Sequence, residues 1–203
     1  MRSQRTKRDS LLIIFYRNPE LGKVKTRLAA SIGDAKAFSI YLLLAEHTRQ
    51  ITESYQVDKV VFYSDFIDHA DSWSNRLYKK QLQDGFDLGE RMENAFRYGF
   101  SEGYKSICII GTDCFELTRN ELTIAFRKLL THDVVIGPAA DGGYYLLGMN
   151  HLHPMLFRNK KWSSSFVCQE TLSDTKLHGL STWELAMLND VDEEKDLPAH
   201  FTA

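Results

Sequence analysis

The sequence has few cysteines and no long apolar run, and each of these deficits excludes a class of protein. Its three cysteines form no Cys-x-x-Cys pair, which argues against both a disulfide framework and a zinc site. The apolar run at residues 11–16 is far shorter than the roughly 20 residues of a membrane span, and shorter than the apolar part of a secretory signal. We therefore expect a cytoplasmic protein with no membrane span.

Several catalytic signatures are also missing. No Gly-x-Gly-x-x-Gly motif follows the first apolar run, which argues against a dinucleotide-dependent dehydrogenase, and the P-loop spacing is absent. The seven histidines lack His-Glu-x-x-His spacing, and the serines at 163–165 lack the Gly-x-Ser-x-Gly elbow of hydrolases. The net charge of -2 provides no global field for nucleic acid, so we expect a small-molecule partner.

Apolar runs and helical periodicity alternate along the chain in the way that builds a parallel sheet. Continuous apolar runs predict strands covered on both faces, at residues 11–16, 59–63, 106–111 and 133–137. Apolar residues at helical spacing predict helices at residues 34–51, 87–100 and 121–130. The alternation predicts an α/β fold, a three-layer α/β/α sandwich around a mostly parallel, Rossmann-like sheet.

The pattern changes after Pro138. Residues 142–148 are typical of a strand entered through a tight glycine turn, with no helix before it, which predicts an antiparallel strand. Residues 150–179 predict loop and short helix, and residues 181–188 a final strand. Because no repeat or linker interrupts the chain, we expect a flexible basic tail at residues 1–10 and a single domain at 11–203.

Ligands of open α/β sheets bind beyond the carboxyl ends of the strands, and the loop after the first strand is rich in cations. It contains Arg17, Lys23, Lys25 and Arg27, and Thr26 stands at the expected start of a helix. The N–H groups of a helix start, together with Lys and Arg side chains, form a phosphate site. The alternative that the sequence leaves open is a solvated basic turn.

An acid follows the apolar strand at 106–111. Asp113 is placed to bind Mg²⁺ or Mn²⁺, because such ions commonly take one or two protein carboxylates and complete their shell with water and phosphate oxygens. A purely structural role as a helix cap is less favoured, since Thr118 or Asn120 can cap the following helix.

The third segment of interest combines acids with paired glycines. Gly142 and Gly143 allow a backbone to approach a ligand closely, and Asp141 can act as a base or orient an acceptor, although Asp-Gly is also an ordinary hairpin signal. The distant Asp190 and Asp192 either belong to the same site or cap a helix that begins near them.

A further segment surrounds the start of the second expected helix. Gln83 ends a short extended run and is a candidate nucleotide contact, and Asp87 can cap the helix. Gly89 costs about 1 kcal/mol relative to alanine in a helix unless something packs closely there. Either a nucleotide base or ribose, or tight packing of the helix on the sheet, explains this glycine.

Taken together, these motifs resemble those of a bacterial family of uncharacterised, glycosyltransferase-A-like transferases in the nucleotide-diphospho-sugar transferase superfamily. The resemblance runs from about residue 11 to residue 197. Two departures are Phe115, where the family usually has proline, and Glu193-Glu194, which replaces the usual Thr-Pro. The motifs are Pro19-x-x-Gly22-x-x-Lys25-Thr26-Arg27-Leu28, Asp87-Leu88-Gly89-Glu90-Arg91-Met92, Gly111-Thr112-Asp113-Cys114, Gly137-Pro138-Ala139-x-Asp141-Gly142-Gly143-Tyr144-Tyr145-Leu146-x-Gly148 and Asp190-Val191-Asp192.

The resemblance implies the GT-A fold, a nucleotide substrate and a divalent cation. By position, Asp113 would bind the metal, Lys25 and Arg27 would contact phosphate, and Asp190 or Asp192 would supply a second metal-side acid.

Three functions follow from this site, in order of preference. The first is metal-dependent glycosyl transfer from a nucleotide sugar to a small-molecule acceptor, with Lys25 stabilising charge and Asp141 acting as base. The alternative is nucleotidyl transfer from a nucleoside triphosphate, as in guanylyltransferases, and the third is a non-catalytic nucleotide-binding protein. The sequence leaves the sugar, base, acceptor and oligomeric state open.

Overall fold

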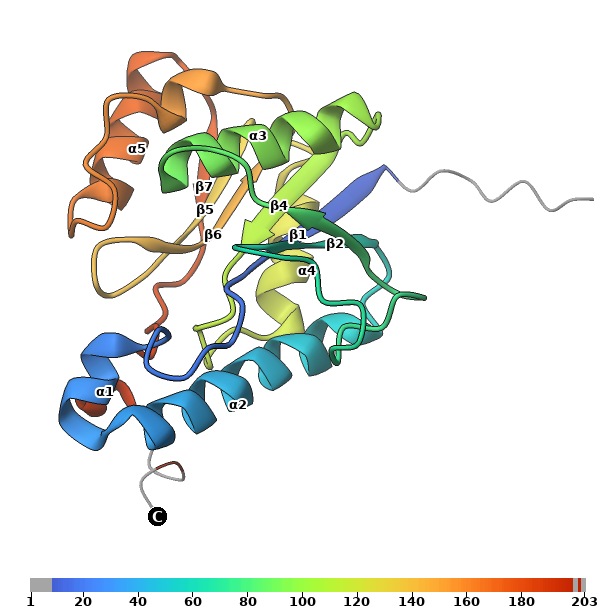
Figure 1. The fold of residues 1–203 in the computed structure, drawn as a ribbon. Coiled ribbons are helices and arrows are strands. Elements are labelled where there is room, and N and C mark those ends of the chain that lie inside the picture. Colours follow the sequence, from blue (N-terminus) through green and yellow to red (C-terminus); the bar gives the residue numbers. More distant parts are fainter. Residues whose placement is uncertain (1–8, 199–200, 202–203) are drawn as a thin grey trace, which may run out of the picture.

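The computed structural model describes residues 9–198 and residue 201, and its centre is a seven-stranded sheet with the order β3-β2-β1-β4-β6-β5-β7 (Figure 1). Residues 1–8 of the expected tail lie outside the described residues, whereas Ser10 already begins the first strand. The strands are β1 Ser10–Tyr16, β2 Asp58–Tyr63, β3 Lys79–Leu82, β4 Ser106–Ile110, β5 Val134–Pro138, β6 Tyr144–Met149 and β7 Thr182–Glu184.

The pairing of the strands confirms the predicted mixed sheet. β1 pairs in parallel with β2 and β4, and β5 pairs in parallel with β7. β6 lies between β4 and β5 and is antiparallel to both, as the glycine turn before it predicted.

The helices form a layer on each face of the sheet, which confirms the predicted three-layer fold (Figure 1). Helices α2 and α4 pack on one face, and α3, η1 and α5 pack on the other. No helix in the described part of the chain is long and apolar enough to span a membrane. The helices are α1 Thr26–Ile32, α2 Asp34–Glu53, α3 Leu88–Ser101, α4 Arg119–Lys128 and α5 Val167–Leu177, with the 3-10 helices η1 Pro154–Phe157 and η2 Glu194–Asp196.

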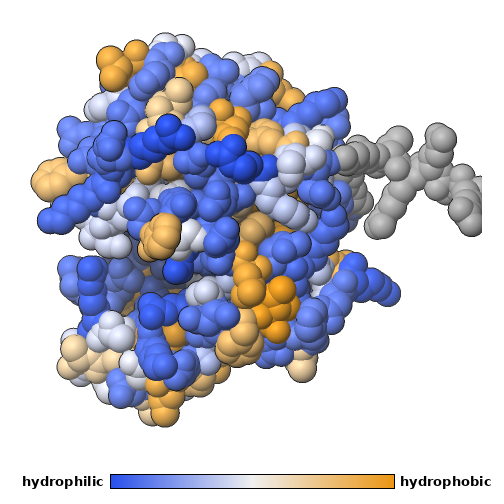
Figure 2. Space-filling view, turned by 45° about the horizontal axis from the view of Figure 1, so that its top comes forward, coloured by the Kyte–Doolittle hydropathy of each residue, from blue (hydrophilic) through white to orange (hydrophobic). Residues whose placement is uncertain are grey.

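Strand β1 shows why its apolar run is continuous. Because successive residues point to opposite faces, Leu12 and Ile14 enter the core beneath α2 and α4, while Leu11 and Ile13 enter the core beneath α3. All four side chains are fully buried. The face drawn in Figure 2 is mostly hydrophilic, with hydrophobic residues in small patches, so most of the strands' apolar side chains are used in these two cores.

Two predicted helix caps are present, and one predicted strand is shorter than expected. Asp87 accepts a hydrogen bond from the Glu90 N–H at the start of α3, and Thr118 forms a capping box with Glu121 at the start of α4. The final strand spans only Thr182–Glu184, and not residues 181–188, because the chain beyond it pairs irregularly with β5.

The buried Asn18 fixes the loops that follow β1 and β2 relative to one another. Its Oδ1 accepts hydrogen bonds from the Asp65 N–H at 3.0 Å and the Phe66 N–H at 3.3 Å. Its Nδ2 donates to the Phe66 carbonyl at 3.0 Å, and its own N–H donates to the Ser64 hydroxyl at 2.9 Å. The buried Asn18 side chain therefore pairs with three backbone groups of the loop after β2.

We expect Asn18→Ala to lower the free energy of unfolding by about 1–3 kcal/mol, because it leaves those backbone groups unpaired. Asn75→Ala is the matched control, since Asn75 is exposed in the loop after β2 and its side chain donates one bond, to the His69 carbonyl. Urea unfolding of both variants checks the prediction. Equal loss of stability in the two variants would contradict it.

Candidate functional site

Two neighbouring cavities lie beyond the carboxyl ends of β1 and β4, and they share the residues Leu88, Asp113, Tyr144 and Asp190. The first cavity has a volume of about 600 Å³ and the second about 500 Å³. The other residues of the first cavity are Phe15, Arg17, Tyr41, Ser64, Asp65, Gln83, Arg91, Met92, Ile109, Ile110, Gly111, Thr112, Tyr145 and Leu147. Those of the second are Arg27, Asp141, Gly143, Trp162, Ser163, Ser164, Ser165, Val167 and Asp192.

Lys25 bridges two of the predicted acids. Its ammonium lies 2.8 Å from Asp192 Oδ1 and 3.3 Å from Asp113 Oδ2, and its side chain is only 7% exposed. Burial opposes the charged form of Lys25, but the attraction of Asp113 and Asp192 outweighs it and raises the Lys25 pKa. Arg27 lies 3.7 Å from the other oxygen of Asp192. Lys25 is thus a buried cation held by two carboxylates.

The backbone of Lys25 is unusual. Lys25 is the N-cap of α1 and has φ 47 and ψ 46, a left-handed conformation that costs a non-glycine residue about 1–2 kcal/mol. Such strain persists only where the surroundings over-determine it. At Lys25 the side chain makes two ion pairs, and the carbonyl accepts a hydrogen bond from the Ala29 N–H at 2.8 Å.

Asp190 is an acid in an unfavourable place for a charge. Burial, followed by repulsion from Asp113 and Asp141, raises the pKa of Asp190 to about 8. Its Oδ1 is buried and has no hydrogen-bond partner. A buried carboxylate oxygen without a partner is expected where a cation or a ligand completes the site.

Backbone contacts bring Asp113 and Asp190 to the same place. The Val191 N–H donates to the Asp113 carbonyl at 3.0 Å, which holds the segment at 190–192 beside the end of β4. A Cβ added at Gly111 would lie 2.7 Å from Asp113 Oδ1, so the carboxylate folds back over a position that only glycine leaves open.

The donor chemistry of these acids fits a hard divalent cation. In the described part of the chain, no three His, Cys, Asp or Glu side chains converge closely enough to form a complete metal site. Asp113 and Asp190 nevertheless offer carboxylate oxygens, and Mg²⁺ needs only one or two of these when water and phosphate supply the rest. Asp192 is instead engaged by Lys25 and Arg27.

The turn at Asp141-Gly142-Gly143 combines both roles that the sequence left open. Asp141 accepts a hydrogen bond from the Gly143 N–H at 2.8 Å, as in an ordinary turn, and also lines the second cavity. Gly142 has φ 90, and a Cβ there would lie 2.0 Å from the Ser165 carbonyl oxygen. The close approach that requires this glycine is therefore made by the chain itself.

The other predicted contacts separate into two groups. Arg17 and Gln83 line the first cavity, where the Gln83 amide also donates to the Phe62 carbonyl at 3.0 Å. Lys23 and Thr26 line neither cavity. Lys23 is 65% exposed and pairs with Glu20 at 2.8 Å, which matches the solvated-turn alternative for that part of the loop.

Sequence reasoning did not identify several of the lining residues. Arg91 lines the first cavity and lies within the motif that starts at Asp87. Its place in that motif is the feature of the sequence that could have identified it. Trp162 explains Gly89, because a Cβ at Gly89 would lie 2.3–2.4 Å from the indole ring. The helix therefore packs against a loop at this glycine, and neither the sheet nor a ligand is needed to explain it.

The cysteine beside Asp113 has no reactive character. Cys114 is 5% exposed, and burial, followed by the charge of Asp190, raises its pKa. It is a packing residue.

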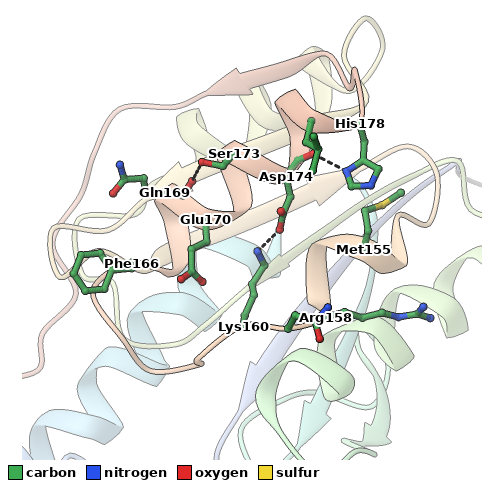
Figure 3. Close-up of a pocket in the computed structure, with 11 residues that line it drawn as sticks. Met155, Arg158, Lys160, Phe166, Gln169, Glu170, Ser173, Asp174 and His178 are labelled. Atoms are coloured by element: carbon green, nitrogen blue, oxygen red, sulfur yellow. Dashed lines mark hydrogen bonds and ion pairs between the residues drawn. The ribbon is translucent and has the colours of Figure 1, made fainter.

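A third cavity, of about 630 Å³, lies between η1 and α5 and contains none of the predicted site residues (Figure 3). Its central polar contact is the ion pair between Lys160 and Asp174 at 2.5 Å. It has no residue in common with the first two cavities.

The raised pKa of Asp190 predicts a pH-dependent stability. Between the ordinary aspartate pKa of about 4 and the folded value of about 8, the folded protein keeps a proton that the unfolded chain releases. Stability should therefore fall as pH rises through this range, by an amount on the order of a few kcal/mol. Asp190→Asn has no such proton, so its stability relative to the parent should increase from pH 4 to pH 8.

Urea unfolding in the presence of a chelator, at several pH values for both proteins, measures this difference. Parallel pH profiles of the parent and Asp190→Asn would show that Asp190 is charged at neutral pH in the folded state.

Comparisons with known proteins agree with the fold and the motifs. A family model described as "Uncharacterized protein conserved in bacteria (DUF2064)" matches residues 47–164, which is more than half of the chain. No curated protein matches the chain.

A protein from Desulfovibrio desulfuricans G20, provisionally named a nucleotide-diphospho-sugar transferase, has 30% sequence identity and a TM-score of 0.85, over 92% of this chain and 83% of its own.

Two more distant structures share the fold. The inositol-1-phosphate CTP transferase from T. maritima has 13% identity and a TM-score of 0.55, over 96% of this chain and 93% of its own. A 4-diphosphocytidyl-2C-methyl-D-erythritol synthase also has 13% identity, with a TM-score of 0.57, over 94% of this chain and 95% of its own. All three relatives carry the names of transferases or a synthase, and their fold is the one predicted from the sequence. The chain belongs to this bacterial DUF2064 family, within the nucleotide-diphospho-sugar transferase superfamily.

Proposed function

We propose that this protein is a metal-dependent transferase that passes a sugar from a nucleotide diphosphate sugar to a small-molecule acceptor. The observation that carries the proposal is the pair of cavities that share Asp113 and Asp190. A transferase needs a donor site and an acceptor site that meet at the reacting atoms. The name of the Desulfovibrio relative supports a sugar nucleotide as the donor.

The first cavity suits the donor. Apart from the shared acids, it has two arginines, Arg17 and Arg91, and one acid, Asp65. Guanidinium groups bind phosphate oxygens in a bidentate manner, so these arginines are the candidate diphosphate contacts. Ser64 and Gln83 add hydrogen-bonding groups for the nucleoside.

The shared acids suit a metal at the junction of the cavities. Mg²⁺ or Mn²⁺ held by Asp113 and Asp190 would stabilise the charge that develops on the departing diphosphate. Lys25 pairs with the Asp113 carboxylate at 3.3 Å and adds a positive charge beside it. Its part in the reaction is therefore electrostatic, and it also positions Asp113.

The second cavity suits the acceptor, with Asp141 in its wall. In the transfer, an acceptor hydroxyl oxygen bonds to the anomeric carbon, and the bond from that carbon to the diphosphate oxygen breaks. The electron pair leaves with the diphosphate, and the hydroxyl proton passes to Asp141 as general base.

We expect Mn²⁺ together with a nucleotide diphosphate sugar to raise the melting temperature of the parent protein. The increase in stability should reach about 2.7 kcal/mol at a ligand concentration 100 times the Kd, because the ligand binds only the folded state. Asp113→Asn should lose the metal-dependent part of the shift. A thermal-shift panel of nucleotide sugars and nucleoside triphosphates, with and without Mn²⁺, measures both effects.

Asp9→Asn is the matched control, because Asp9 is 62% exposed and precedes the amino end of β1, whereas the site lies beyond the carboxyl end of that strand. It should keep the full shift. A shift with nucleoside triphosphates alone would favour nucleotidyl transfer, and a full metal-dependent shift in Asp113→Asn would remove Asp113 from the metal site.

We expect Asp141→Asn to bind the donor normally but to lower kcat by about 10²–10⁴-fold, the usual contribution of a general base. The Asn side chain keeps the oxygen that accepts the Gly143 N–H, so the turn should persist. Release of the nucleoside diphosphate and the thermal shift, measured on the same samples, separate catalysis from binding. An unchanged kcat would exclude Asp141 as the base.

A further inference from the structure

One part of the wall of the second cavity is the segment at 162–165, which contributes Trp162 and three serines. The Ser164 hydroxyl is buried and has no hydrogen-bond partner. In the described part of the chain, three buried side-chain polar atoms lack a partner, and two of them, Ser164 Oγ and Asp190 Oδ1, belong to residues that line this cavity. Unpaired buried groups are costly, so their presence in one cavity points to a ligand that pairs with them.

The charges of the second cavity select against an anionic ligand. Its lining contains four carboxylates, of Asp113, Asp141, Asp190 and Asp192, and one cation, Arg27. That arginine and the buried Lys25 are both engaged with Asp192. The proposed divalent cation would be balanced by Asp113, Asp190 and the donor diphosphate. A phosphate or carboxylate on the acceptor would therefore meet the Asp141 carboxylate with no free cation among these residues to balance it.

The same cavity also has apolar surface. Trp162 packs its indole ring against the backbone of α3 at Gly89, where a Cβ would lie 2.3–2.4 Å from ring atoms. Tyr144 lines the cavity as well. Aromatic rings beside hydroxyl and carboxylate groups suit a ligand that presents both C–H faces and O–H groups.

We infer that the acceptor of the proposed transfer, on which this inference rests, is an uncharged polyhydroxylated compound about the size of one or two sugar rings. The Ser164 hydroxyl bonds one of its hydroxyl groups, and its C–H face packs on Trp162. The volume of about 500 Å³ lies within the usual range for small-molecule sites, about 300–1,000 Å³. A neutral acceptor would differ from inositol 1-phosphate, the phosphorylated compound in the name of the T. maritima transferase.

The experiment measures direct binding of acceptor probes, so that it does not depend on turnover. Saturation-transfer NMR is recorded with a panel of neutral methyl glycosides and with the matching sugar phosphates, with and without the diamagnetic ion Mg²⁺ and a nucleoside diphosphate. We expect at least one neutral glycoside to bind and its phosphate to bind more weakly.

Ser164→Ala should weaken the binding of that glycoside about 2- to 10-fold, the value of one hydrogen bond. Its melting temperature should stay the same or rise, since the lost hydroxyl has no partner in the folded protein. Ser173→Ala is the matched control, because Ser173 lies on α5 in the wall of the third cavity. It should bind the glycoside as the parent does.

The outcomes distinguish this inference from the proposed function. If nucleotide sugars bind with Mn²⁺ but the sugar phosphates bind as tightly as the glycosides, or Ser164→Ala changes nothing, the acceptor assignment is wrong and the transferase proposal stands. If glycosides bind through Ser164 but no nucleotide binds, the acceptor site is supported and the donor proposal fails. If no probe of either charge binds, the acceptor assignment is overturned.

Discussion

The contact on which the candidate site depends is the buried ammonium of Lys25 between Asp113 and Asp192. A charge with 7% exposure is stable only when carboxylates compensate for its lost hydration, and here they come from the end of β4 and from the segment before η2. Lys25 itself stands at the start of α1, where its backbone is left-handed. One cation therefore fixes three segments that are far apart in the sequence.

The antiparallel strand β6 explains why the site has two halves. It inserts between β4 and β5, so the parallel half of the sheet formed by β1, β2 and β4 ends at the first cavity. The turn that leads into β6 carries Asp141, which lines the second cavity. Tyr144, the first residue of β6, lies between the cavities and lines both. This division suits a reaction in which donor and acceptor approach the same two acids from different sides.

Much of the fold and part of the site could be predicted from the sequence. Local patterns predict the buried strands, the caps at Asp87 and Thr118 and the antiparallel β6. Each of these features depends on residues that are neighbours in the sequence. The acids and the basic loop were predicted to meet because both follow strands of one sheet. Local patterns do not predict which side chains meet across the fold. The sequence therefore assigns Lys25 to phosphate, whereas the structure pairs it with two carboxylates.

The contact between Lys25 and Asp192 joins residues 167 positions apart. Since loop closure over such a distance comes late in folding, the sheet can form before the acids at 190–192 reach the site. During synthesis, the ribosome must release the segment at 190–192 before the charge of Lys25 is fully compensated. A chain cut before residue 190 would therefore keep the strands of the sheet but lack Asp190 and Asp192.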